Sequence, residues 1–503
     1  MTEHSDDKVL AAIDLGSNSF HMIISRLRDD GHFQVVDRLR DMVQLRAGLD
    51  QHGYLSEQAQ QKAIACLARF GERINNLQAN NVRIVGTNTL RVAKNSQSFL
   101  AKARKALNYP IEIIPGEEEA RLIYLGVAHS LAFDSSRRLV MDIGGGSTEF
   151  IIGEGFEGLR RESLEMGCVS FSQQFFANGW VSSERMRLAL ITAGTRLRAI
   201  QRPYRNMGWV DAIGASGTIR CVANIVRENG WADDGVITPD SLDKLIEAIV
   251  SVKHIGELKL SGLSDERKSV LPGGVAVLKA AFDRLAIEKM TVSDGALREG
   301  LLYDLLGRIQ HDDERDRTVL AFSRRYQADE QHAERVRVMA VSFFEQVSDD
   351  WDINQEEYLD RMQWAAKLHE VGLAISHHSF HKHSAYLIGH SDLPGFSREE
   401  QYALALVVQG QRRSFPKKEL KTLPQELESS TKKIMILLRL AAVFNRGRSE
   451  RTDTAVKLAV TKKGLRLSLP QGWLSKHPLT EADLMQEAEY LKSIKLKLKI
   501  REA

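Results

Sequence analysis

The sequence is poor in cysteine and proline and has no low-complexity stretch. Its three cysteines are Cys66, Cys168 and Cys221, and their spacing forms no pair. An odd number of unpaired cysteines argues against a disulfide scaffold or a zinc knuckle and fits a reducing compartment. With ten prolines, 43% hydrophobic and 27% charged residues, the chain has an ordinary globular balance rather than that of a disordered protein.

The chain also lacks the patterns of secretion, of a membrane span and of a P-loop. Residues 1–8 are polar and acidic, unlike a secretory signal. The most apolar segment, residues 434–444, is short and contains Arg439, so it falls well below the length of a membrane span. No Walker A loop is present, which excludes a P-loop enzyme. We therefore expect a soluble, cytoplasmic protein.

Charge is unevenly distributed along the 503 residues, a length that suggests three or four domains. The net charge is only +3, but residues 411–503 contain 21 Lys and Arg against 10 Asp and Glu, a local balance of +11. The remaining residues have a balance of −8. A solvated basic surface and a surface that holds a polyanion both account for this asymmetry.

Two segments 128 residues apart resemble each other. Residues 11–24 are AAIDLGSNSFHMII and residues 139–152 are LVMDIGGGSTEFII. In each, an apolar run reaches an aspartate (Asp14 or Asp142), a turn of small residues follows, and a second apolar run returns. This pattern predicts two β-hairpins, and the matching offsets favour a duplicated lobe over two unrelated turns.

The predicted turns have the chemistry of a phosphate site. Small residues with accessible N–H groups form a nest for anionic oxygens, and nearby Ser and Thr hydroxyl groups add donors. The aspartate that ends each preceding strand can hold Mg²⁺ directly or through water. A third turn, residues 214–218 (GASGT), follows a strand predicted over residues 210–213 and opens a helix, whose N-terminus can bind a phosphate.

The rest of residues 1–310 alternates strand and helix patterns. Strands are predicted over residues 82–86 and 111–114. The first leads to a helix cap at residues 87–89, and the second to a helix that starts at Glu117, after Pro115 and Gly116. This alternation indicates an α/β core of two related lobes.

At these motifs the chain resembles the exopolyphosphatase and guanosine pentaphosphate phosphatase family of the actin-like superfamily. The resemblance lies in residues 14–19 (DLGSNS), 116–121 (GEEEAR), 142–149 (DIGGGSTE), 214–218 (GASGT) and 293–300 (SDGALREG), and it continues through residues 368–372, 383–386 and 393–396. It covers nearly the whole chain, in order.

The resemblance implies a fold of four parts. A duplicated actin-like (ribonuclease H-like) α/β core would have lobe I in residues 1–130 and lobe II in residues 131–310. A mostly helical, His-Asp-phosphohydrolase-like domain would follow in residues 311–447. A small, basic C-terminal α+β domain would occupy residues 448–503.

The resemblance also implies roles for individual residues. Glu119 is expected to be the general base that activates the attacking water, and Arg91 to face the transferred phosphoryl group. Asp142, Glu149 and Asp14 are expected to hold Mg²⁺. The expected phosphate-binding residues are Ser17, Asn18, Ser19, Gly144, Gly145, Gly146, Ser147, Thr148, Gly214, Ser216, Gly217 and Thr218. These residue types suit phosphoryl transfer, which depends on positioning and on charge stabilisation.

Glu119 and Arg91 also have structural explanations. Three consecutive glutamates, residues 117–119, are favoured in the first turn of a helix by its dipole without any catalytic role. An arginine such as Arg91 most often pairs with a surface carboxylate.

The C-terminal half is expected to begin with a charge-rich linker at residues 312–317 and to continue as helices, for example over residues 361–373. A strand is predicted over residues 465–469. We interpret this half as a scaffold that binds the polymer and forms part of a dimer.

The resemblance to the His-Asp phosphohydrolase fold raises the question of a second metal centre. His332 and His369 match expected ligands, but Glu370 replaces the Asp of the His-Asp pair, and Ala442 stands where a later Asp is expected. These two departures argue against a working centre. The histidines at positions 377, 378, 381 and 383 are interpreted as solvated surface residues rather than as a metal site.

The resulting hypothesis is a Mg²⁺-dependent exopolyphosphatase that removes terminal phosphate from inorganic polyphosphate by direct attack of water. The alternative within the family is hydrolysis of guanosine pentaphosphate (pppGpp) to the tetraphosphate (ppGpp), and residues 145–146 and 293–295 favour the polyphosphatase. A kinase of the same fold and a non-catalytic polyphosphate-binding regulator are two further classes. The presence of Glu119 argues against both.

The expected partners are inorganic polyphosphate and a second copy of the chain in a homodimer. A monovalent cation such as K⁺ is a candidate cofactor beside Mg²⁺. Neither a nucleic-acid partner nor peripheral membrane association is predicted.

Overall fold

The computed structural model describes residues 8–28, 33–131, 136–310, 312–353, 356–448 and 456–502. The chain divides into two compact units, Met1–Asp313 and Glu314–Ala503. The predicted linker at residues 312–317 is wrong for most of its length, because helix α13 (Glu314–Arg325) begins inside it. Glu314 and Asp316 lie in the first turn of this helix, where the helix dipole favours acidic side chains.

The first unit contains two five-stranded sheets with the same connectivity. The order is β3-β2-β1-β4-β5 in the first sheet and β10-β9-β6-β7-β8 in the second, which is the same order read from the other edge. In each, three antiparallel strands are extended by two parallel ones. The duplicated two-lobed core is therefore confirmed. The strands are β1 (Val9–Leu15), β2 (Phe20–Leu27), β3 (Phe33–Asp41), β4 (Val82–Gly86), β5 (Glu112–Ile113), β6 (Arg137–Ile143), β7 (Thr148–Glu154), β8 (Glu157–Leu164), β9 (Asp211–Gly214) and β10 (Thr291–Val292).

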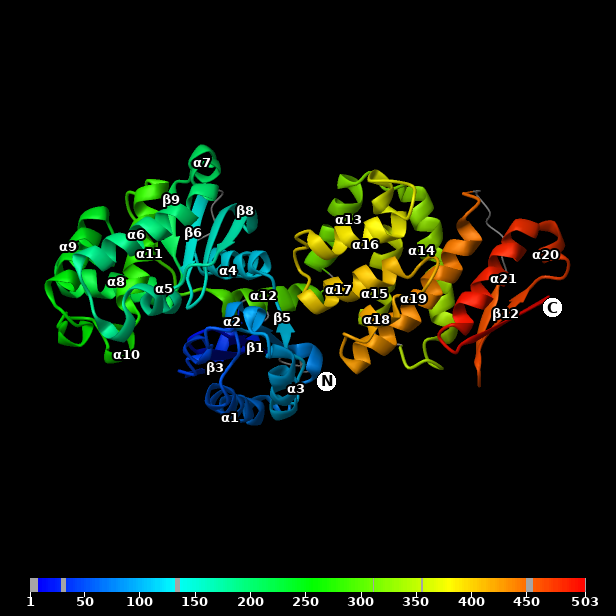
Figure 1. The fold of residues 1–503 in the computed structure, drawn as a ribbon, viewed down its shortest axis with the longest axis horizontal. Helices are drawn as coiled ribbons and strands as arrows, with labels where there is room; N and C mark the ends of the chain where they lie inside the picture. Colours follow the sequence, from blue (N-terminus) through cyan, green and yellow to red (C-terminus); the bar gives the residue numbers. More distant parts are fainter. Residues whose placement is uncertain are drawn as a thin grey trace, which may run out of the picture. The chain divides into compact units, whose positions relative to one another are not determined.

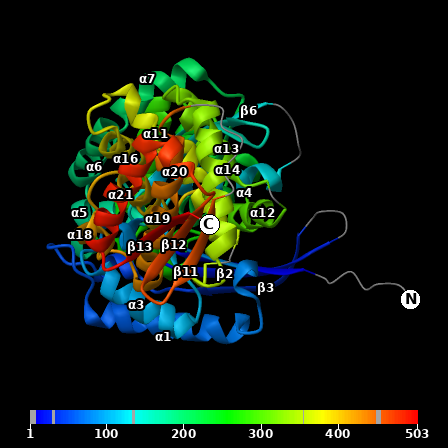
Figure 2. The ribbon, with the colours of Figure 1, turned by 90° about the vertical axis from the view of Figure 1, so that its right-hand side faces the viewer.

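Helices cover the outer face of each sheet. Apolar side chains of the first sheet form one core with α1 (Glu57–Ile74) and α3 (Ser96–Leu107), which Figure 2 shows on the side of β2 and β3 away from α12. The second sheet forms a separate core with α5 (Cys168–Phe175), α6 (Ser183–Arg196), α7 (Arg198–Met207), α8 (Gly217–Glu228), α9 (Pro239–Ser251) and α11 (Leu271–Leu285). Short helices α2 (Asn88–Val92) and α10 (Asp265–Lys268) lie in the connections.

Two helices, α4 (Gly116–Ser130) and α12 (Leu297–Ile309), lie between the sheets (Figure 1). Their buried side chains share a core with residues of both sheets, such as Leu10 and Val140. The helices meet at glycines, since a Cβ on Gly126 would overlap the carbonyl oxygen of Ala296, and one on Gly300 would overlap that of Leu122. Helix α12 also packs on β1. The last residues of the predicted lobe II therefore contact the first sheet as well.

Most local predictions agree with the structure to within a few residues. The strands expected over residues 82–86, 210–213 and 465–469 are β4, β9 and β12 (Gly464–Leu469), and the helix expected at Glu117 is α4. The strand over residues 111–114 shortens to β5. Thr87 does occupy the cap position of α2, but its side chain makes no capping hydrogen bond.

The second unit combines helices with a three-stranded sheet of order β11-β12-β13. The elements after α13 are α14 (Glu330–Val347), α15 (Glu356–Leu368), α16 (Phe380–His390), α17 (Arg398–Gln409), α18 (Lys417–Leu420), α19 (Gln425–Asn445), β11 (Lys457–Thr461), β12, α20 (Trp473–Lys476), α21 (Pro478–Lys492) and β13 (Lys497–Glu502). The helix predicted over residues 361–373 ends at Leu368, and the short 3₁₀ helix Val371–Ala374 follows.

The helices and the sheet of the second unit share one hydrophobic core, to which residues of α14, α19, β12 and α21 all contribute. A buried ion pair between Arg439 and Glu487, with 2.6 Å between Nη2 and Oε2, joins the two parts. The sheet and the helices of the second unit therefore pack together, and the division predicted at residue 448 stays a prediction. The predicted boundary falls beside residues 449–455, which lie outside the described residues.

The apolar segment 434–444 lies inside α19 and is buried in this core. None of the helices in the described part of the chain has both the length and the apolar character that crossing a membrane requires.

Candidate active site

The two predicted hairpins form and their turns lie against each other. Asp14 is opposite His21 in the first hairpin, and Asp142 is opposite Glu149 in the second. A Cβ on Gly145 would lie only 2.9 Å from the Cβ of Ser17, and one on Gly146 would overlap the side chain of Asn88. The turns are therefore rich in glycine because the lobes approach each other there, which leaves no room for side chains.

Several predicted phosphate ligands already have partners within the protein. The N–H of Gly144 donates to the carbonyl oxygen of Ser147 at 2.9 Å, which closes the second turn. The hydroxyl groups of Thr148 and Thr218 donate to the carbonyl oxygens of Met166 and Ile143, the latter at 3.3 Å. These three groups thus have a structural role in the turns that the sequence pattern did not reveal.

The serines of the turns are held in a similar way. Ser17 Oγ accepts a hydrogen bond from Thr89 Oγ1 at 2.8 Å, and Ser19 Oγ lies 2.7 Å from His21 Nε2. Ser216 caps α8 by accepting from the N–H of Ile219 at 3.1 Å. The turn at residues 214–218 therefore opens a helix as predicted, and that helix has its positive end at the turn.

Arg91 and Glu119 form a buried pair. Nη1 of Arg91 donates to Glu119 Oε2 at 3.1 Å and to the carbonyl oxygen of Ile114 at 2.7 Å. The side chains are 7% and 10% exposed, respectively. The alternative of a surface ion pair for Arg91 is therefore wrong. The residue lies on α2 and its partner in the first turn of α4, so that two elements far apart in the sequence build the pair.

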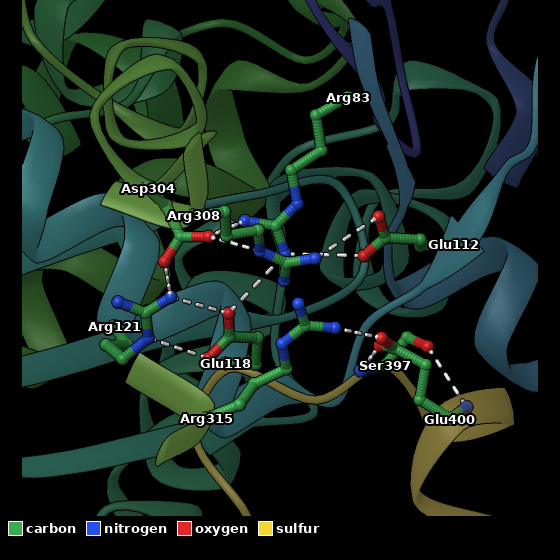
Figure 3. Close-up of polar contacts among 9 residues, drawn as sticks. All are labelled: Arg83, Glu112, Glu118, Arg121, Asp304, Arg308, Arg315, Ser397 and Glu400. Atoms are coloured by element: carbon green, nitrogen blue, oxygen red, sulfur yellow. Dashed lines mark hydrogen bonds and ion pairs between the residues drawn. The ribbon is translucent and has the colours of Figure 1, made fainter. Parts of the chain in front are cut away.

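A second buried network anchors the helix that carries Glu119 (Figure 3). Arg121 donates through Nε and Nη2 to the two carboxylate oxygens of Glu118, both at 2.8 Å. Arg83 and Arg121 also bond Asp304 of α12, and Arg308 Nε bonds Asp304 at 3.1 Å. Burial alone would raise the pKa of Asp304, but the three arginines outweigh it and hold that pKa well below its usual range. Glu118 and Arg121 thus fix the turn of α4 that presents Glu119.

Figure 3 also labels residues of the second unit. There Arg315 Nη1 bonds Glu400 Oε1 at 2.5 Å, and Glu400 accepts from the N–H of Ser397 at 2.8 Å, which caps α17.

The carboxylates of the first unit are crowded together in a buried place. Burial and, after it, the charge of Glu119 raise the pKa of Asp14 to about 8 and that of Asp142 to about 7. The pKa of Glu149 is also raised by burial and by Glu119 and Asp142, although Ser163 donates to its Oε1 at 2.8 Å. In the described part of the chain, Asp14 Oδ1 is buried without a hydrogen-bond partner.

These carboxylates fit a divalent cation. Oxygen ligands suit Mg²⁺, and a nearby positive charge would keep the acids ionised. Among the described residues, no three of them bring ligand oxygens within 4.8 Å of one another. A Mg²⁺ ion here would therefore take one or two carboxylates and complete its shell with water and substrate oxygens.

Four arginines that the sequence analysis did not single out act electrostatically on His21. Burial and, after it, the charges of Arg298, Arg40, Arg220 and Arg267 lower the pKa of His21 to about 3. Arg298 Nη1 lies 3.5 Å from His21 Nδ1. Arg267 reaches the N-terminus of α8, where a Cβ on Gly217 would overlap its guanidinium group. Arg298 lies within the SDGALREG motif and Arg220 two residues after the GASGT turn, so proximity to these motifs was the available signal.

Together, a two-lobed α/β fold, an Arg–Glu pair, buried carboxylates and small-residue turns have the chemistry expected of a protein that acts on phosphate groups. The chain belongs to the Ppx/GppA phosphatase family, whose model matches residues 23–309, while the model of domain III of the same family matches residues 315–488. It is therefore a hydrolase that acts on phosphoanhydride bonds, as the sequence predicted.

Full-length relatives correct the predicted substrate. The guanosine-5'-triphosphate,3'-diphosphate pyrophosphatase of Vibrio vulnificus is 40% identical to this chain over 491 residues, which cover 97% of each protein. The protein of the same name from Photobacterium profundum is 38% identical over 482 residues, or 95% of each. These relatives contradict the expectation of an exopolyphosphatase and favour the alternative substrate.

The residues used to favour polyphosphate have a structural explanation. Gly145 lies against Ser17, and a Cβ on Gly295 would overlap the carbonyl oxygen of Gly126. Close packing therefore accounts for these glycines without reference to the substrate.

Solved structures support the fold of the first unit. An exopolyphosphatase from Cytophaga hutchinsonii is similar with a TM-score of 0.54 and 24% identity, and the match covers 59% of this chain and 97% of that one. The PPX-GPPA enzyme of Aquifex aeolicus has a TM-score of 0.50 and 26% identity over 58% of this chain and 98% of its own.

Proposed function

We propose that the protein hydrolyses guanosine-5'-triphosphate,3'-diphosphate and releases the terminal phosphate of its 5' chain. The observation that carries this proposal is the 40% identity, over 97% of both chains, to a relative of that name. The Arg91–Glu119 pair and the buried carboxylates supply the chemistry that such a hydrolysis needs.

Glu119 is the proposed general base. Burial raises its pKa, while the charge of Arg91 opposes the rise, and a base works best when its pKa lies near the working pH. Within the described part of the chain, the two side-chain hydrogen bonds of Arg91 both use Nη1. Nη2 can therefore donate to the transferred phosphoryl group without breaking either bond.

Asp142, Glu149 and Asp14 are the proposed Mg²⁺ residues, and the ion would neutralise charge on the phosphate oxygens when bound. Asp142→Asn is expected to raise the Mg²⁺ concentration for half-maximal turnover, because an amide is a poorer ligand than a carboxylate for a hard cation. A Mg²⁺ titration of the initial rate measures this. An unchanged titration would place the ion on other residues. A requirement for K⁺ stays a prediction.

The non-reacting phosphates have a proposed site as well. Arg40, Arg220, Arg267 and Arg298 all act electrostatically on His21, so they concentrate positive charge in one place. Such a cluster suits a compact substrate with two separate phosphate chains, because guanidinium groups bind phosphate oxygens in pairs. The turns at residues 16–19, 145–147 and 214–217 would add backbone donors.

The deciding experiment compares phosphate release from guanosine-5'-triphosphate,3'-diphosphate, inorganic polyphosphate and ATP by the purified protein at one Mg²⁺ concentration. We expect kcat/KM for the guanosine substrate to exceed that for either competitor by about tenfold or more, which is roughly 1.4 kcal/mol of transition-state discrimination. Equal or greater efficiency on polyphosphate contradicts the proposal. Glu119→Gln serves as the blank for contaminating phosphatases.

For the second unit we infer the His-Asp-phosphohydrolase-like arrangement, with the small β11–β13 module at its end. The division of the chain into four domains and the homodimer remain predictions. Light scattering of the full-length protein tests the dimer.

A further inference from the structure

One side-chain cluster outside the lobes has the composition of a metal centre. His332 on α14 and His369 and Glu370 after α15 each offer a ligand atom, and these atoms all lie within 4.8 Å of one another. Among the described residues this is the only group of three or more His, Cys, Asp or Glu that meets that criterion. His332 Nε2 is 3.7 Å from Glu370 Oε1. Ligand atoms about 2.0–2.1 Å from a tetrahedral zinc ion lie roughly 3.4 Å apart, so little movement would be needed.

Hydrogen bonds orient the ring of His369. Its Nδ1 lies 2.7 Å from the carbonyl oxygen of Ala366, which can only accept. Nδ1 therefore carries the proton, and Nε2 keeps its lone pair for a ligand. Ser384 and Gln411 donate to the carbonyl oxygen of His369, at 3.1 and 2.5 Å, and hold its backbone. A histidine fixed in this way by a carbonyl group is the usual arrangement around bound metals.

His332 is buried, and its Nδ1 has no hydrogen-bond partner among the described residues. A buried imidazole nitrogen without a partner is the kind of unsatisfied polar group that a bound ion or an ordered water accounts for.

An arginine positions the carboxylate. Arg448 donates through Nη2 to Glu370 Oε2 at 2.6 Å and through Nη1 to Asp329 Oδ2 at 2.8 Å. Glu370 Oε1 is the oxygen nearest to His332. Arg448 therefore binds one carboxylate oxygen of Glu370, and the other oxygen faces the imidazole ring of His332. Asp329 also partly neutralises the charge of Arg448. This reduces the repulsion between the guanidinium group and a cation bound at Glu370.

The cluster opens into a pocket of about 250 Å³. Ala442 lines this pocket at the position where the resemblance to the His-Asp phosphohydrolase fold implied an aspartate ligand. Two histidines and a glutamate form a complete set of protein ligands for a zinc ion that keeps its fourth position open, so no ligand at position 442 is required. Arg412 also lines the pocket and lies over the ring of Phe380 at 5.5 Å.

We propose that His332, His369 and Glu370 bind one divalent transition-metal ion of the zinc type, with its fourth position open to the pocket. Arg412 would favour an anion, such as a phosphate group, as the ligand at that position. The proposal differs from the sequence interpretation, in which the two substitutions at this site argued against a metal. The proposal stands independently of the proposed function, since every residue involved lies in the second unit.

The test uses the full-length protein, stripped of metal by a chelator and then incubated with Zn²⁺ in the presence of excess Mg²⁺. Excess Mg²⁺ competes with zinc for sites made of carboxylate oxygens, whereas a site with two imidazole ligands favours zinc. After removal of free metal, mass spectrometry measures the zinc retained per chain. We expect one equivalent in the unaltered protein and in the control His378→Ala, which removes an exposed histidine outside the pocket lining.

Glu370→Gln and His369→Ala are expected to weaken zinc binding by about tenfold or more. Zinc should also raise the Tm of the unaltered protein but not that of these variants, because only a ligand that binds the folded state stabilises it. Glu370→Gln keeps the shape of a partly exposed side chain, so it tests the site even when the buried His369→Ala variant does not fold. Replacement of zinc by Co²⁺ should give the visible absorption of a low-coordinate site in the unaltered protein.

Zinc retention below about one-tenth of an equivalent in the unaltered protein, or equal retention in Glu370→Gln, overturns the proposal. Phosphate release from guanosine-5'-triphosphate,3'-diphosphate is measured on the same samples. Unchanged turnover in Glu370→Gln together with lost zinc supports a separate centre, and the two proposals can thus fail independently.

Discussion

At the scale of single residues, Glu119 combines burial, an arginine partner and a position at the start of a helix. Replacement by Gln keeps its shape but removes the proton acceptor. We expect Glu119→Gln to lower kcat by at least about 100-fold, because general-base catalysis contributes that much or more. Steady-state kinetics should show a KM within about threefold of the original, since the amide still packs against Arg91.

A variant that keeps more than about half of the original kcat would remove Glu119 from the mechanism. Glu117→Gln is the matched control. It makes the same change in the same helical turn, at a residue that is more exposed than Glu119.

The buried aspartates link stability to pH. In the folded protein without metal, Asp14 and Asp142 keep their protons up to a pKa of about 8 and about 7, whereas the unfolded chain loses them near the ordinary value of 3.8. Between these values the folded state binds more protons, so the free energy of unfolding must fall as pH rises. Each carboxyl group makes the free energy of unfolding fall by at most about 1.4 kcal/mol per pH unit.

Denaturant unfolding in the presence of a chelator, from pH 5 to pH 8, measures this decline. Asp14→Asn should reduce the slope, and Mg²⁺ should reduce it in the unaltered protein. The exposed Asp240→Asn should leave it unchanged. A slope that is the same in Asp14→Asn and in the unaltered protein would show that Asp14 is ionised in the folded state.

At the scale of elements, the contact between α4 and α12 holds the two lobes around the site. Gly126 and Gly300 let the helix backbones touch, and a methyl group on either would overlap a carbonyl oxygen. We expect Gly126→Ala to destabilise the protein by about 1–3 kcal/mol, although alanine is the better helix former, because overpacking outweighs the gain in propensity.

Gly389→Ala on α16 is the control, since its methyl group would meet Ala405 Cβ at an ordinary 3.8 Å. It should be neutral or stabilising by up to about 1 kcal/mol. Thermal or denaturant unfolding of both variants measures the difference. Equal effects would show that the helices have room to separate at Gly126.

At the scale of the whole molecule, the proposed active-site residues all lie in the first unit. The similar chain from Cytophaga hutchinsonii matches this protein over 97% of its own length but over only 59% of this one, so a similar fold exists in a shorter chain. We expect a fragment of residues 1–313 to fold and to hydrolyse the guanosine substrate at a measurable rate that Glu119→Gln abolishes. Circular dichroism and phosphate release test this. A folded but inactive fragment would show that the second unit supplies a part of the site.

The sequence alone determined the elements whose signal is local. The hairpins at residues 11–24 and 139–152 follow from continuous apolar runs on both sides of small-residue turns, and the helix at Glu117 follows from its proline and its acidic first turn. The duplication of the lobe also came from the sequence, because two copies of one motif fold by the same rules.

Only the tertiary structure decided which distant groups meet. Arg91 and Glu119 are 28 residues apart in the sequence but share a hydrogen bond. Arg40 and Arg298 are 258 residues apart, yet both act on His21. Likewise, His332 reaches His369 and Glu370 only through the packing of α14 and α15. The glycines at positions 145 and 295 suggested a substrate, whereas packing explains them. The physical reason is that local patterns fix the backbone, while burial, pKa and ligand geometry depend on neighbours that the chain brings together only when it folds.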